Sequence, residues 1–213
     1  MENIKIYDAN LRELGVMDRK EAHANAQWHI TFHCWIVSKP KNAILFQLRS
    51  KEKKNFPDMF DISAAGHLID DEEIADGIRE VSEEMGIEIT FQDLYPLGYR
   101  VEVDDSENGQ KNREYQSVYI AVIDKELNEF KPQVEEVAGL MWMNISKALE
   151  LFSGKVDSAL VEGVIYNKEK MLWEKKERKV SKKDFIPRIQ NYYLTAAIMA
   201  ERVIEGKFPL SIS

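Results

Sequence analysis

Three glutamates close together in the sequence are the residues best suited to chemistry. Glu80 lies three residues before Glu83 and four before Glu84, a spacing that places side chains on one face of an α-helix. Carboxylates at this spacing repel one another, so a cation is expected to offset them. Carboxylate oxygens suit Mg²⁺ or Mn²⁺, which complete their shells with water and substrate phosphates. The spacing therefore predicts a metal site for phosphate chemistry, with Glu83 or a nearby carboxylate accepting a proton from water.

The flanking residues extend this pattern. Arg79 directly precedes the glutamates, Gly86 follows them, and Gly66 stands upstream. The segment resembles the Nudix box, in which a glycine, five residues, a glutamate and seven residues precede Arg-Glu, an aliphatic residue, any residue, Glu-Glu, any residue, glycine and an aliphatic residue. Residues 79–87 match its second half throughout, and residues 29–144 have the strand and hairpin order of that family.

The resemblance implies a fold and an activity. The fold is an α/β Nudix-type sandwich with a mixed sheet. The activity is Mg²⁺-dependent hydrolysis of a phosphoric anhydride, with Mn²⁺ as a substitute ion. The substrate would be a small molecule, a nucleoside diphosphate derivative or a related organic diphosphate.

The resemblance also assigns roles to residues. Metal binding and catalysis fall to Glu80, Glu83 and Glu84. Structural roles fall to a motif glutamate, to Arg79, which holds the loop, and to Gly66 and Gly86, which serve backbone turns. The general base stays open among three carboxylates outside the box, Glu114, Glu135 and Glu136.

The first half of the box is one residue short. Six residues, 73–78, separate Glu72 from Arg79, where the family has seven. In the family, the first glutamate pairs with the arginine and is mainly structural. Either Glu72 or Asp71 is a candidate for that role here.

The histidines resemble those of a Nudix relative, the type 1 isopentenyl-diphosphate isomerase. His23, His29 and His67 fall near its metal-binding histidines, and Glu114 lies where one of its glutamates would be, which makes these four residues a candidate second metal site. Ala65 occupies the place of that enzyme's cysteine, so isomerisation lacks one of its two proton-transfer groups. An isomerase-like enzyme and a non-catalytic phosphate sensor remain the alternatives to a hydrolase, and the retained glutamates favour the hydrolase.

Hydrophobic periodicity predicts the elements that position these residues. Strands are expected at 29–37, 43–49, 62–66, 97–103, 113–123 and 140–143, with a turn at Asn108-Gly109. Helices are expected at 71–85, 146–152, 157–179 and 184–205. Residues 1–145 would form a Nudix domain with N-terminal strands, and residues 146–213 a helical extension packed on the same domain.

The extension carries apolar residues at helical spacing, for which a homodimer interface and a cover over its own sheet are equal alternatives. Phosphate contacts are considered for Arg49, Lys53, Lys54 and Arg100. Base stacking is considered for Trp28, Phe32, Phe56 and Tyr99, with burial in the core as the alternative.

Composition limits the location and the partners. The 213 residues carry a net charge of −8, which disfavours nucleic-acid binding. Eight basic side chains in residues 168–183 alternate with glutamates, as on a solvated face. A single cysteine, Cys34, excludes an intrachain disulfide and fits a reducing compartment. No signal-like or 18-residue apolar run occurs. A cytoplasmic protein without a membrane partner is expected.

Overall fold

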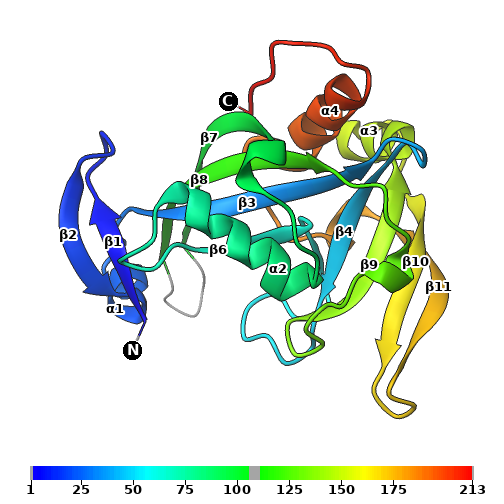
Figure 1. Cartoon of the computed structure of the whole chain (residues 1–213), viewed down its shortest axis with the longest axis horizontal. Helices are drawn as coiled ribbons and strands as arrows, with labels where there is room; N and C mark the ends of the chain where they lie inside the picture. The colour runs from blue at the N-terminus through cyan, green and yellow to red at the C-terminus, as the bar shows by residue number, and fades with distance from the viewer. Residues whose placement is uncertain (1, 106–110, 213) are drawn as a thin grey trace.

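One mixed β-sheet forms the centre of the molecule (Figure 1). The computed structural model describes residues 2–105 and 111–212. The strands of this sheet within those residues are β3 (His29–Ser38), β4 (Ala43–Arg49), β5 (Phe60–Asp61), β6 (Ala64–His67), β7 (Leu94–Asp105), β8 (Lys111–Val122), β9 (Val137–Asn144), β10 (Ala159–Asn167) and β11 (Leu172–Val180). The main path runs β11–β10–β9–β4–β3–β8–β7, with β5 beside β4 and β6 beside β3. β3 and β8 are parallel.

Helices cover both faces of this sheet. α2 (Arg79–Met85) lies on one face, and α3 (Ile145–Ser153) and α4 (Tyr192–Ile204) pack together on the other (Figure 1). Successive side chains of a strand point to opposite faces. In β3, Trp35 accordingly joins the core under α3 and α4, while Ile36 joins the core under α2. The predicted α/β sandwich with a mixed sheet is confirmed.

A small second sheet lies at the N-terminal end. β1 (Asn3–Tyr7) and β2 (Glu13–Asp18) pair antiparallel, and the short helix α1 (Arg19–Ala24) follows them. Asp18 caps α1 because its side chain accepts hydrogen bonds from the backbone amides of Lys20 and Glu21. This cap fixes the helix that carries His23.

Most predicted strands are present within one to three residues of the expected bounds. The predicted strand at 62–66 is displaced, because β5 ends at Asp61 and β6 begins at Ala64. Between them, the Ser63 hydroxyl donates to the carbonyl of Leu45 at 2.6 Å and accepts from the amide of Ile36 at 2.8 Å. The turn predicted at Asn108-Gly109 lies outside the described residues.

The helix predicted at 157–179 is wrong. Those residues form the antiparallel strands β10 and β11, which extend the sheet. Ala159, Val161 and Gly163 are buried while Leu160 and Glu162 are exposed, which is the two-residue period of a strand. Apolar residues, among them Leu160, Val164 and Met171, also occur at helix-like intervals, and these intervals misled the prediction.

Two further helices begin later than predicted. Residues 71–85 give a 3₁₀ helix, η1 (Ile74–Ile78), before α2 begins at Arg79. Asp184 ends the short 3₁₀ helix η4 (Lys182–Asp184), residues 185–191 form a connection that contains Pro187, and α4 starts only at Tyr192. Gly86 ends α2 as predicted, with φ of 64° and the carbonyl oxygen of Lys131 2.2 Å from where a Cβ would stand.

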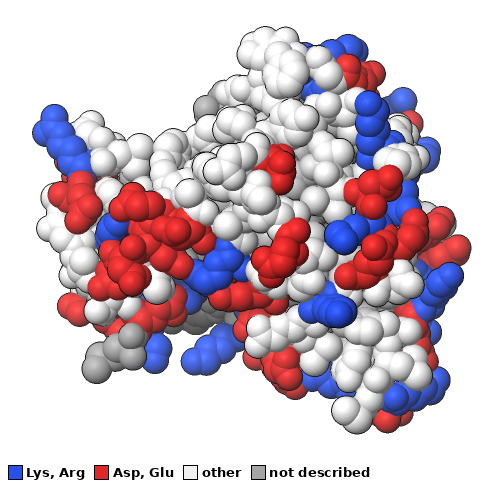
Figure 2. Space-filling view, in the orientation of Figure 1, with Lys and Arg blue, Asp and Glu red and all other residues white. Residues whose placement is uncertain are grey.

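Charges of both signs are interleaved over β10 and β11, whereas acidic side chains gather over the end formed by β1 and η1 (Figure 2). The interleaving agrees with the solvated face predicted for residues 168–183. Within the described ranges, no helix combines the length and apolar character needed to span a bilayer.

Candidate active site

A cavity of about 620 Å³ gathers the predicted site residues. The three glutamates of α2 line it together with His23, His67 and Glu114. These residues come from α1, α2, β6 and β8, so distant parts of the sequence meet here. The three box glutamates thus line one cavity.

Glu84 is the deepest of the three glutamates. One carboxylate oxygen accepts hydrogen bonds from the backbone amide of Ala65 and the side-chain amide of Gln47, each at 3.0 Å. Burial raises the pKa of Glu84 to about 7, although these hydrogen bonds and Lys53 act in the opposite direction. A buried carboxylate held in this way has the chemistry of a ligand for a hard cation.

Glu80 reaches the cavity because residue 66 has no side chain. A Cβ on Gly66 would lie 2.0 Å from the carboxyl carbon of Glu80. Gly66 lies inside β6, so the structure corrects its predicted role in a turn: the close approach of Glu80 is what requires a glycine. Burial raises the pKa of Glu80 as well. A bound cation would offset this second desolvated carboxylate.

Arg79 connects the glutamates of the motif. Its Nε and Nη2 donate to the two carboxylate oxygens of Glu72 at 2.7 and 3.0 Å. Its Nη1 lies 3.0 Å from Glu80 and 2.9 Å from Glu83. Despite the opposing effect of burial, the hydrogen bond from Arg79 lowers the pKa of Glu72. Glu72 is therefore the paired residue, and Asp71 is exposed.

The 3₁₀ helix explains how a shortened box keeps this pairing. A 3₁₀ helix rises about 2.0 Å per residue, against about 1.5 Å in an α-helix. Five of the six residues between Glu72 and Arg79 lie in η1. They span more length per residue than an α-helical turn would, so one fewer residue suffices.

Three histidines meet at one end of the cavity. A ligand atom from each of His23, His29 and His67 lies within 4.8 Å of the others, and the Nε2 atoms of His23 and His67 are 3.1 Å apart. His29 Nδ1 is 2.9 Å from the carbonyl of Gln27, which leaves Nε2 as the free nitrogen. That atom has no hydrogen-bond partner among the described residues and lies 4.0 Å from Glu114.

Burial lowers the pKa of each of these histidines, although Glu114 opposes the shift at His29. Neutral imidazole is the form that binds metals. Glu114 is oriented by the side-chain amide of Gln116, which donates to it at 2.8 Å. Sequence reasoning missed Gln116, which the two-residue period of β8 places on the same face as Glu114.

The candidate general bases differ in whether they line the cavity, and Cys34 lies outside it. Glu114 and Glu136 line the cavity, and Glu136 forms an ion pair with Lys53. Glu135 is exposed and does not line it. Cys34 lies in the core under α2, and burial raises the pKa of its thiol to about 12. Cys34 therefore cannot supply the proton-transfer group that is missing at Ala65.

Arginines and one lysine supply the positive charge of the site. Arg49 and Lys53 line the cavity as considered, whereas Lys54 is exposed and Arg100 is buried outside it. Arg188, after β11, also lines it and was missed. In the sequence, Arg188 stands out as the single charged residue of the apolar segment 185–189.

The aromatic candidates for base stacking are mostly elsewhere. Phe56 lines the cavity, Phe32 is in the core, Trp28 stacks on Tyr115 with ring centroids 4.7 Å apart, and Tyr99 is exposed. His33, given no role from sequence, lines the cavity, and its Nδ1 lies 3.0 Å from the hydroxyl of Tyr192.

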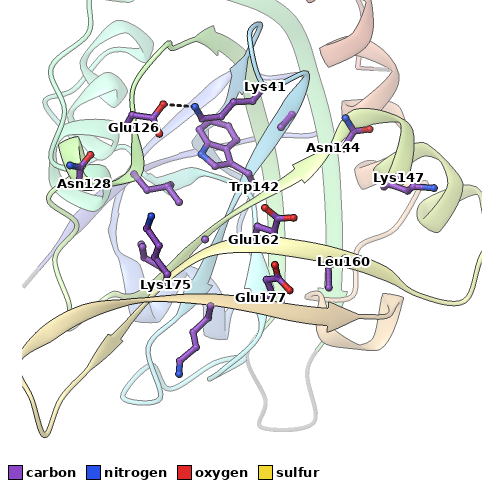
Figure 3. Close-up of a pocket in the computed structure, with 15 residues that line it drawn as sticks. Lys41, Glu126, Asn128, Trp142, Asn144, Lys147, Leu160, Glu162, Lys175 and Glu177 are labelled. Carbon is purple, nitrogen blue, oxygen red and sulfur yellow. Dashed lines mark hydrogen bonds and ion pairs between the residues drawn. The ribbon is translucent and has the colours of Figure 1, made fainter.

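A larger cavity of about 880 Å³ lies against β9, β10 and β11. Trp142, Glu162 and Glu177 point into it, and Lys41 pairs with Glu126 at its rim at 2.6 Å (Figure 3). None of the box residues or histidines lines it. The chemistry of the motif thus belongs to the smaller cavity.

Comparison with known proteins identifies the family. A model of the NUDIX domain matches residues 27–161. The chain belongs to the Nudix family. An uncharacterized Nudix hydrolase of Clostridium acetobutylicum is 35% identical over 196 residues, 90% of this chain and 93% of that protein. The chain is thus an enzyme of the Nudix hydrolase class, which acts on phosphoric anhydrides.

Two further relatives have names that specify an isopentenyl or prenyl diphosphate. The isopentenyl-diphosphate Δ-isomerase 1 of Photorhabdus laumondii is 32% identical over 109 residues, 49% of this chain and 61% of that protein. A prenyl-diphosphate phosphatase of Methanosarcina mazei is 26% identical over 160 residues, 71% of this chain and 86% of that protein. The fold resembles a solved Deinococcus radiodurans protein with a TM-score of 0.57 and 18% identity, over 72% of this chain and 90% of that chain.

Proposed function

We propose that this Nudix hydrolase cleaves the diphosphate linkage of a small organic diphosphate with Mg²⁺ bound by Glu80, Glu83 and Glu84. The observation that carries the proposal is the joint presence of these carboxylates and several cations in one cavity. A bound diphosphate would use both, because the carboxylates would hold the metal ion and the cationic side chains would neutralise phosphate charge. The cations that line the cavity include Arg19, Arg49, Lys53, Arg79 and Arg188.

The chain's own residues prepare the reaction. Bound Mg²⁺ would supply charge neutralisation and make a water more acidic. Gln47 and the amide of Ala65 hold the Glu84 carboxylate in place, and Arg79 contacts both Glu80 and Glu83. Glu83, Glu114 and Glu136 line the cavity and are the candidates for taking the proton of water.

The three clustered histidines and Glu114 support a second metal site. The chemistry of the donor set fits, since three neutral imidazoles and a carboxylate suit a transition metal such as Zn²⁺ or Mn²⁺. The unpartnered Nε2 of His29 fits such a ligand role, and Gln27 and Gln116 orient His29 and Glu114. His23, His29, His67 and Glu114 would hold this ion.

The similarity to an isomerase and to a prenyl-diphosphate phosphatase favours a prenyl-type diphosphate among organic diphosphates. An isomerase-like activity is the second candidate, supported by the histidine cluster. The inert Cys34 and the methyl side chain of Ala65 count against it. A hydrolase needs no group in that position, so the same residues favour hydrolysis. A sensor without catalysis would not need Glu83, which contacts the cavity.

The test is a substrate panel with Mg²⁺. Prenyl diphosphates, nucleoside diphosphate derivatives, sugar nucleotides and thiamine diphosphate would be incubated with wild-type protein, and released phosphate or monophosphate measured. We expect at least one substrate to be cleaved, with activity lost in EDTA and reduced at least 100-fold in Glu83→Gln. The exposed Glu88→Gln is the matched control and should retain activity. A folded wild-type protein that cleaves none of these with Mg²⁺ would reject the proposal.

A homodimer and a cytoplasmic location stay predictions. Among the apolar residues of the segment 146–213, Tyr192 and Val203 are buried within this chain, whereas Leu160 and Met171 are exposed. Light scattering tests the dimer by giving a mass of twice or once the 24.7 kDa of the chain.

A further inference from the structure

We propose that Arg188 is a phosphate-binding residue of this cavity and takes the phosphoryl group of the substrate that lies away from the glutamates of α2. The inference rests on the proposed function, because it assumes a diphosphate in the cavity. It assigns a substrate contact to the connection between β11 and α4, which lies beyond the residues 27–161 matched by the family model.

Arg188 stands at a defined place relative to the glutamates. Its Nη2 donates to Asp61 at 2.8 Å. Asp61 on β5 is paired in register with Gln47 on β4, and the Gln47 amide donates to Glu84 at 3.0 Å. Two residues therefore connect the guanidinium to the deepest carboxylate of α2. Arg188 and Glu84 come from different parts of the chain and both line the cavity.

The ion pairs around Arg188 leave an excess of positive charge. Asp61 lies 3.6 Å from Arg49 as well as 2.8 Å from Arg188. Glu102 forms an ion pair with Arg100 and lies 3.8 Å from Arg188. Among the described residues, this group thus contains three guanidiniums and two carboxylates, each with a side chain at most 17% exposed. Within this group the guanidiniums outnumber the carboxylates by one, and a phosphate bound beside Arg188 would balance that local charge.

The same arginines have unused donors. The Nε atoms of Arg49 and Arg188 are buried and have no hydrogen-bond partner within the described part of the chain. Both residues line the cavity. Guanidinium groups bind phosphate through two parallel N–H donors. In Arg188, Nη2 donates to Asp61, and Nε is the donor that no described residue accepts.

The backbone of the connection that carries Arg188 is hydrogen-bonded both before and after this residue. The amide of Ile186 donates to the carbonyl of Phe60 at 3.0 Å. The carbonyl of Ile189 accepts from Arg100 at 2.6 Å. These contacts fix the backbone on either side of Arg188, so little conformational entropy is lost when an anion binds. A purely structural ion pair would need Asp61 alone and would not require an open cavity beside it.

The test compares Arg188→Lys with Arg178→Lys. Lysine keeps the charge near Asp61 but loses the planar fork of donors. Arg178 also pairs with a carboxylate, Asp184 at 3.2 Å, but does not line the cavity. We expect the dissociation constant of inorganic pyrophosphate, measured by calorimetry in EDTA, to rise at least tenfold in Arg188→Lys and to stay unchanged in Arg178→Lys. With Mg²⁺ and a cleaved substrate, Arg188→Lys should raise KM more than it lowers kcat.

Hydrogen exchange on the unmodified protein covers the case in which Arg188→Lys does not fold. Pyrophosphate should slow exchange of amides in residues 185–190 and leave those of β11 unchanged. Equal pyrophosphate affinity in wild type and folded Arg188→Lys would overturn the inference, as would no metal-free binding by wild type or no protection of residues 185–190. Because these measurements need neither Mg²⁺ nor turnover, they fail independently of the proposed hydrolysis.

Discussion

At the scale of single residues, the site holds carboxylates in surroundings that disfavour their charge. Glu84 is buried, and the close approach of Glu80 is possible only because Gly66 lacks a side chain. Such an arrangement lowers the stability of the protein when these carboxylates are charged, as expected for ligands of the proposed cation. Removing the charge should therefore stabilise the fold while removing function.

Glu84→Gln should stabilise the metal-free protein at high pH. The pKa of Glu84 is raised from 4.5 to about 7 in the folded state. The folded state thus favours the protonated carboxyl, and stability is lost as the pH rises from about 4.5 through 7. A difference of about 2.5 units corresponds to roughly 3 kcal/mol at most, so we expect a gain of about 2 kcal/mol.

Denaturant unfolding in EDTA measures this gain. It should be present at pH 8, absent at pH 4.5 and absent at both in Glu88→Gln. An unchanged or lower stability of Glu84→Gln at pH 8 would show that the buried carboxylate carries no such cost.

The histidine cluster gives a second prediction at this scale. Because burial keeps the three imidazoles neutral at pH 7, added Co²⁺ should bind and give visible d–d absorption. His67→Ala should remove that absorption, whereas His33→Gln should keep it, since His33 lies outside the cluster. Equal spectra for both variants would exclude the cluster as a metal site.

At the scale of elements, η1 and α2 form one unit held by Arg79. Glu72 accepts two hydrogen bonds from Arg79 and one from the amide of Ile69 at 2.9 Å. Asp71 is adjacent in sequence and exposed. The two residues therefore make a matched pair for testing which carboxylate fastens the shortened loop.

Glu72→Gln should destabilise the protein by about 1–2 kcal/mol and lower hydrolysis, because charge-assisted hydrogen bonds to Arg79 are lost. Asp71→Asn should change neither by a measurable amount. Thermal unfolding and steady-state kinetics of the two variants give the comparison. A larger effect from Asp71→Asn than from Glu72→Gln would show that Asp71, and not Glu72, fastens the loop.

The sequence predicted elements well where one pattern dominated. The strands around β3 and β4 and the glycine stop of α2 follow from clear periodicity and from Gly86. The residues of β10 and β11 carry two patterns at once, since apolar residues at helical spacing, such as Leu160 and Val164, stand among the alternating buried positions Ala159, Val161 and Gly163. Burial in the sheet decided between them, and burial depends on contacts distant in sequence.

At the scale of the whole molecule, the sheet brings together segments separated by more than 150 residues. His23, the box glutamates and Arg188 meet in one cavity. The box glutamates were predictable because their spacing is local. Arg188 was missed because its ion pairs are with Asp61 and Glu102, which are distant in sequence. Gln116 was missed although its hydrogen bond is to Glu114 on the same strand.

The most direct measurement of the central claim is Mn²⁺ binding followed by electron paramagnetic resonance. His67→Ala would serve as the background, so that the histidine cluster does not contribute. We expect this protein to bind Mn²⁺, Glu83→Gln in the same background to bind at least tenfold more weakly, and Glu88→Gln to bind as the background does. Equal Mn²⁺ affinity in the Glu83→Gln and Glu88→Gln proteins would contradict a metal site on α2.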